Sequence, residues 1–101
     1  MDFAYAIQAL SNGQAAKRST WGGYVKKDVT SAEDATTETY TLTFVTRSGS
    51  QFVYTFDGTS WTPPSGGMTL DAELLEAMCA DDWQTGKASA FEAARSGSGL
   101  W

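Results

Sequence analysis

The chain contains no histidine and only one cysteine among its 101 residues. Without histidine the common acid–base pairs and triads are excluded, and a nucleophile would need a lysine or a carboxylate as its base. The single cysteine, Cys79, excludes an intramolecular disulfide, and no zinc ligand set is present. We therefore predict that the protein is not an enzyme and needs no cofactor and no metal.

Positive charge and long apolar runs are also scarce. Seven Lys and Arg residues stand against 12 Asp and Glu residues, for a net charge of −5. So few cations cannot form the broad basic surface that gives nucleic-acid affinity, so no DNA or RNA partner is expected. No apolar run approaches the roughly 20 residues of a membrane span, and no signal peptide is evident. We expect a cytoplasmic protein that does not bind membranes.

Aromatic side chains are what the chain has in excess. They make up 13% of the residues, and four of them are tryptophans: Trp21, Trp61, Trp83 and Trp101. A domain of this size buries only about two-thirds of the surface of its unfolded chain. Either the core is rich in aromatic rings, or some rings lie in an oligomer interface. Indoles beside Arg, Asp and Gly can also stack on a flat base, which favours a small aromatic, charged ligand.

The hydrophobic pattern predicts a single α+β ligand-binding domain over residues 1–95, followed by a flexible tail over 96–101. We expect an N-terminal helix packed on a small twisted antiparallel sheet, with a second short helix near the C-terminus. Apolar spacing predicts helices over 2–11, 70–79 and 88–95, with Asp2 as the first N-cap. The predicted strands are 14–20, 24–29, 39–46 and 51–56.

Residues 39–46 and 51–56 predict an antiparallel hairpin with one aromatic face. Their apolar and aromatic side chains alternate with Thr and Val at period two. Such a face is more typical of a core than of a ligand site. The segment from Trp61 to Gly67 contains two prolines, which lack an N–H, so we expect it to leave the sheet.

Two short stretches offer candidate binding groups. Gly22-Gly23 matches neither the dinucleotide motif nor the P-loop, but it allows a backbone to approach a ligand closely. Asp82 follows the helix predicted over 70–79. Its carboxylate either accepts backbone N–H groups at a turn or binds a ligand, and the sequence leaves both open. Cys79 is expected to be a small buried residue of that helix.

The order of these motifs resembles the second family of Thoeris anti-defence proteins, small phage proteins that sequester nucleotide immune signals. The resemblance rests on the opening helix with Arg18 and Trp21 after it, the stretch Trp61-Thr62-Pro63-Pro64-Ser65, and a leucine-rich helix running into Ala80-Asp81-Asp82-Trp83. It spans about residues 1–83. Two departures are a longer link over 66–72 and a longer tail after Trp83, both of which can reshape a pocket rim.

The resemblance implies a homotetramer in the cytoplasm of an infected bacterial cell, with ligand pockets between protomers. It implies a cyclic ADP-ribose-type signal (glycocyclic ADP-ribose) as ligand, or a cyclic dinucleotide at a separate site, bound without cleavage. On this chain Trp21 and Trp61 would stack on rings, Arg18 would contact phosphate, and Asp82 would accept from ribose hydroxyls or a base edge. The full set of candidate ligand-binding residues is Arg18, Trp21, Gly22, Gly23, Tyr24, Trp61 and Asp82.

Two other functions are compatible with the sequence. One is hydrolysis of such a nucleotide signal, which would return a changed compound after denaturation. The other is inhibition of a host protein through the aromatic face, which would give a tight protein partner and no bound small molecule.

Overall fold

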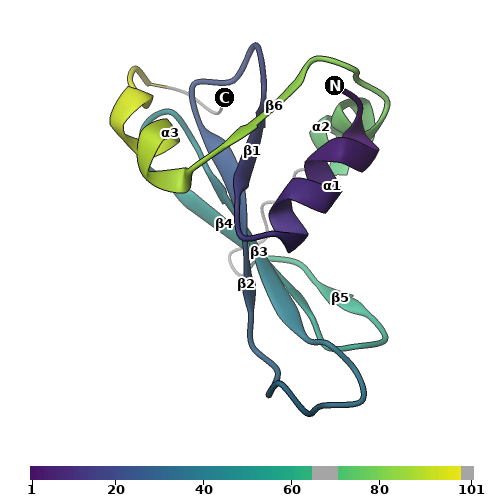
Figure 1. The fold of residues 1–101 in the computed structure, drawn as a ribbon. Helices are drawn as coiled ribbons and strands as arrows, with labels where there is room; N and C mark the ends of the chain where they lie inside the picture. Colours follow the sequence, from purple (N-terminus) through teal and green to yellow (C-terminus); the bar gives the residue numbers. More distant parts are fainter. Residues whose placement is uncertain (65–70, 99–101) are drawn as a thin grey trace.

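The computed structural model describes residues 1–64 and 71–98, except for the side chains of 71–74. Within these residues, six antiparallel strands form one sheet in the order β5-β4-β3-β2-β1-β6. Figure 1 shows α1 and α2 on one side of this sheet and α3 on the other. The predicted α+β class is confirmed. The elements are α1 (Phe3–Ser11), β1 (Ala15–Arg18), β2 (Tyr24–Val29), β3 (Tyr40–Val45), β4 (Gln51–Phe56), β5 (Trp61–Thr62), α2 (Asp71–Met78), β6 (Trp83–Gly86) and α3 (Ala88–Ala94).

The N-terminal helix begins and ends where local chemistry requires. The Asp2 carboxylate accepts a hydrogen bond from the backbone N–H of Tyr5 at 3.1 Å, which satisfies one of the free donors of the first turn. Gly13 follows the helix with a φ of 82°, a conformation that glycine adopts without strain. The helix buries Ala6, Ala9 and Leu10 against the sheet.

The aromatic face predicted for the central hairpin is confirmed. Leu42 pairs with Tyr54 and Phe44 pairs with Phe52 in the β3–β4 register, so these side chains share one face. The same face carries Val25 of β2, which pairs with Phe44. The larger core cluster forms here, beneath α1.

A second, smaller core lies on the opposite face, beneath α3. Tyr24 and Val45 pack there against Phe91. The Tyr24 hydroxyl donates a 2.7 Å hydrogen bond to the carboxylate of Glu92. Burial, strengthened by this bond, raises the pKa of Tyr24 to about 12.

Three details differ from the sequence-based prediction. Trp61 and Thr62 do not leave the sheet. They form the edge strand β5, because both residues have the backbone N–H that the following prolines lack. Residues 83–86 form a strand, β6, that pairs with β1. Cys79 is exposed, because α2 ends at Met78 and Cys79 lies in the turn after it. The predicted helix start at residue 70, most of the 66–72 link and the end of the tail lie outside the described residues.

Candidate functional site

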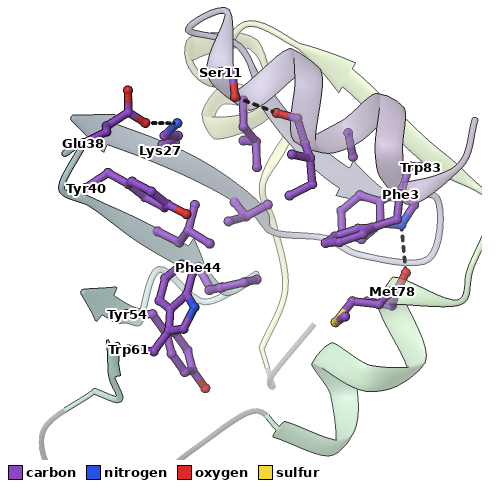
Figure 2. Close-up of a pocket in the computed structure, with 16 residues that line it drawn as sticks. Phe3, Ser11, Lys27, Glu38, Tyr40, Phe44, Tyr54, Trp61, Met78 and Trp83 are labelled. Carbon is purple, nitrogen blue, oxygen red and sulfur yellow. Dashed lines mark hydrogen bonds and ion pairs between the residues drawn. The ribbon is translucent and has the colours of Figure 1, made fainter. Parts of the chain in front are cut away.

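A cavity of about 550 Å³ lies between α1 and the aromatic face of the sheet, and Figure 2 shows the side chains that line it. Volumes of this size suit small-molecule ligands. Most of the lining is apolar or aromatic, with a few polar groups. The lining residues are Phe3, Ala6, Ile7, Leu10, Ser11, Val25, Lys27, Glu38, Tyr40, Leu42, Phe44, Tyr54, Trp61, Ala77, Met78 and Trp83.

The cavity exists because α1 covers only part of the aromatic face. This helix packs over β1, β6 and β2. The side chains of β3 and β4 on the same face continue beyond it, and they line the cavity together with the helix. The cavity therefore forms where the apolar face of β3 and β4 extends beyond the end of α1.

Trp61 forms one wall of the cavity within a cluster of three rings. Its ring centroid lies 5.5 Å from that of Tyr40, nearly perpendicular to it, and 5.1 Å from that of Phe56. These two neighbours fix the indole on the edge strand, yet 47% of Trp61 remains exposed. The exposed part of the ring is available for stacking on a flat ligand.

Lys27 and Glu38 supply the charged groups of the cavity wall. The ammonium of Lys27 lies 2.8 Å from a carboxylate oxygen of Glu38 and 4.4 Å from the ring centroid of Tyr40. The Lys27 side chain is only 12% exposed, whereas that of Glu38 is 54% exposed. Figure 2 shows this ion pair beside Tyr40.

A second polar cluster surrounds Arg18 where β1 pairs with β6. The guanidinium lies 3.1 Å from Asp82 and 3.6 Å from Glu76. Ser19 donates a 2.7 Å hydrogen bond to the other oxygen of Asp82. This bond and that from Arg18 lower the pKa of Asp82, and the hydrogen bond to Asp82 raises the pKa of Arg18. Arg18 is thus already paired with two carboxylates.

The remaining predicted site residues lie in different surroundings. Trp21 is 5% exposed and packs edge-on against Trp83 and Phe44 within the main core. Tyr24 points to the α3 face, away from the cavity.

The glycine pair lies between packed protein segments. A Cβ on Gly23 would lie 1.9 Å from the carbonyl oxygen of Val45, and one on Gly22 would lie 2.9 Å from the Cβ of Arg47. The close approach that Gly23 permits is therefore one between neighbouring backbone segments of the sheet.

The structure brings together Arg18 and Asp82 but separates them from Trp61. Arg18 lies on β1 and Trp61 lies on β5, and these two strands are four positions apart in the sheet. At the usual strand spacing this is roughly 19 Å along the sheet. Within the single chain, the predicted phosphate contact and one of the predicted stacking rings therefore belong to different regions.

Sequence reasoning did not select Lys27, Glu38 or Tyr40. The signal for Lys27 was its position between Val25 and Val29, because alternation places a cation on an otherwise apolar face. Tyr40 belongs to the aromatic face that the sequence predicts, and such a face is more typical of a core than of a ligand site. No local signal marks Glu38, which reaches the cavity from the segment between β2 and β3.

No group of His, Cys, Asp and Glu suited to a metal ion occurs in the part of the chain that the structure describes. Over the same residues, no helix is both long enough and apolar enough to cross a bilayer. Comparison with protein-family models, curated proteins and solved structures finds no match.

Proposed function

We propose that this protein binds a small nucleotide signal, of the cyclic ADP-ribose or cyclic dinucleotide type, and sequesters it without cleaving it. The observation that carries the proposal is the aromatic cavity of about 550 Å³, with the half-exposed Trp61 in its wall. The resemblance to Thoeris anti-defence proteins supports the nucleotide class and a role in phage anti-defence.

The cavity has the chemistry that a nucleobase needs. An apolar lining removes the flat ring from water, and Trp61 with Tyr40 offers aromatic surface for stacking. Tyr40 and Lys27 are among the polar residues of the lining that can orient a ligand.

Binding without cleavage is supported by the side chains around the cavity. The chain has no histidine, and the carboxylate of the lining, Glu38, is paired with Lys27. A carboxylate that acts as a general base at neutral pH would need surroundings that shift its pKa towards neutrality. We therefore propose that the ligand is held by stacking and charge contacts alone.

We further propose a homotetramer, as the resemblance implies. Large apolar side chains on and near α1 and α2 are exposed in the single chain, among them Tyr5, Ile7, Leu75 and Met78. Burial of such side chains between protomers would remove apolar surface from water.

Light scattering is expected to give a mass near four times 10.8 kDa. A monomer at micromolar concentration would contradict the proposed tetramer.

The fate of the ligand tests the proposed function. The protein is incubated for hours with cyclic ADP-ribose, glycocyclic ADP-ribose and cyclic dinucleotides in turn, separated from free compound, and heated. Mass spectrometry of the released material is expected to return the starting compound in full.

Two results would contradict sequestration. Product that accumulates in proportion to protein concentration would indicate a hydrolase. Retention of no compound, together with capture of a defined host protein at the aromatic face, would indicate a protein-binding inhibitor.

A further inference from the structure

Lys27 is an unusual residue for the wall of an aromatic cavity. Its side chain is 12% exposed, and its ammonium lies between the carboxylate of Glu38 and the ring of Tyr40. A charge withdrawn from water in this way needs a partner of opposite charge. A ligand that fills the cavity must therefore either leave this ion pair intact or take the place of one of its two members.

Glu38 is the member of the pair that can be exchanged. Its side chain is 54% exposed, and it comes from the segment between β2 and β3 and not from the sheet itself. A carboxylate this exposed loses little when it returns to water, because such ion pairs are worth little. Lys27, in contrast, is fixed by the pairing of β2 with β3, where it lies opposite Leu42.

The ammonium of Lys27 and the indole of Trp61 flank the same ring. The first lies 4.4 Å from the Tyr40 centroid, and the second has its centroid 5.5 Å from it. A cation and a stacking surface are thus separated by one aromatic ring. In a nucleotide, one ribose likewise separates the phosphate from the base.

We infer that Lys27 binds the anionic group of the ligand and that this group replaces Glu38, while the ligand's flat ring lies against Trp61. The inference rests on the proposed function and defines its ligand class: a planar aromatic ring that carries a phosphate within one sugar of the ring. Glu38 then disfavours such ligands in the free protein, because their phosphate must displace its carboxylate.

Adenosine monophosphate and adenosine form a matched probe pair, since they share the base and ribose and differ in the phosphate. Their affinities are measured by calorimetry for the wild type and for Lys27→Met, Lys27→Arg and Glu38→Gln. Lys27→Met is expected to weaken the monophosphate about tenfold and to leave adenosine within about twofold. Lys27→Arg should restore the preference. Glu38→Gln should strengthen the monophosphate and leave adenosine unchanged.

The opposite signs expected for Lys27→Met and Glu38→Gln separate this role from a structural one. An unfolding midpoint close to that of the wild type shows that each variant is folded. Equal losses for both probes in Lys27→Met, or weaker monophosphate binding in Glu38→Gln, would overturn the inference while leaving the cavity as the binding site. Failure of the wild type to bind both probes would overturn the inference alone, whereas failure to retain any of the cyclic compounds would overturn the proposed function.

Discussion

Replacing Trp21 with alanine is expected to lower the free energy of unfolding by about 3–5 kcal/mol, because it removes a large ring from the centre of the core. The indole is 5% exposed and lies edge-on to Trp83, with ring centroids 5.2 Å apart, and to Phe44 at 6.4 Å. A domain of this kind has roughly 5–15 kcal/mol of stability in all. The loss would therefore be a large fraction of the total.

Urea denaturation followed by circular dichroism measures this effect. Trp61→Ala is the matched control, because it removes the same side chain from an edge strand where 47% of it is exposed. We expect its cost in stability to be well below that of Trp21→Ala. Similar stabilities for wild type and Trp21→Ala would show that the indole does not hold the core together.

Replacing Trp61 with alanine is expected to weaken ligand binding by about 1–3 kcal/mol, the usual cost of one lost base stack. The reason is that Trp61 presents exposed indole to the cavity while Tyr40 and Phe56 hold it in place. Trp61→Phe should recover part of the affinity, since it keeps a smaller aromatic ring. Calorimetric titration with cyclic ADP-ribose measures the change.

Arg18→Ala is an informative comparison for the same titration. Arg18 lies four strand positions from Trp61 and is paired with Asp82 and Glu76. A ligand held within the cavity of one protomer should tolerate its loss better than the loss of Trp61. A larger effect of Arg18→Ala would instead place the phosphate at the Arg18–Asp82 cluster and favour a pocket between protomers.

The fold was largely predictable because its signals are local. Alternation of Tyr40, Leu42 and Phe44 with threonines predicts both the strand and its aromatic face. The edge strands were harder to predict. Residues 61–62 and 83–86 are too short to show a period, and they become strands only because β4 and β1 offer them hydrogen-bonding partners.

The candidate site was less predictable because it depends on which part of the sheet is covered by α1. Nothing in the sequence near Lys27 shows that α1 stops short of the β3–β4 end of the sheet, or that Glu38 reaches the cavity wall. The resemblance to Thoeris anti-defence proteins implies a stacking role for Trp21. In the structure, that tryptophan packs in the core. Residue type alone did not distinguish a buried indole from one at a pocket.

The most direct test of the account follows the indole N–H signals of 15N-labelled protein during titration with cyclic ADP-ribose. The chain has four tryptophans, so each signal can be assigned from a single Trp→Phe variant. If the ligand stacks in the aromatic cavity, the Trp61 signal should shift most, and the signal of the core residue Trp21 should shift little. A Trp61 signal that stays in place at saturating ligand, while that of Trp21 moves, would contradict the cavity as the binding site.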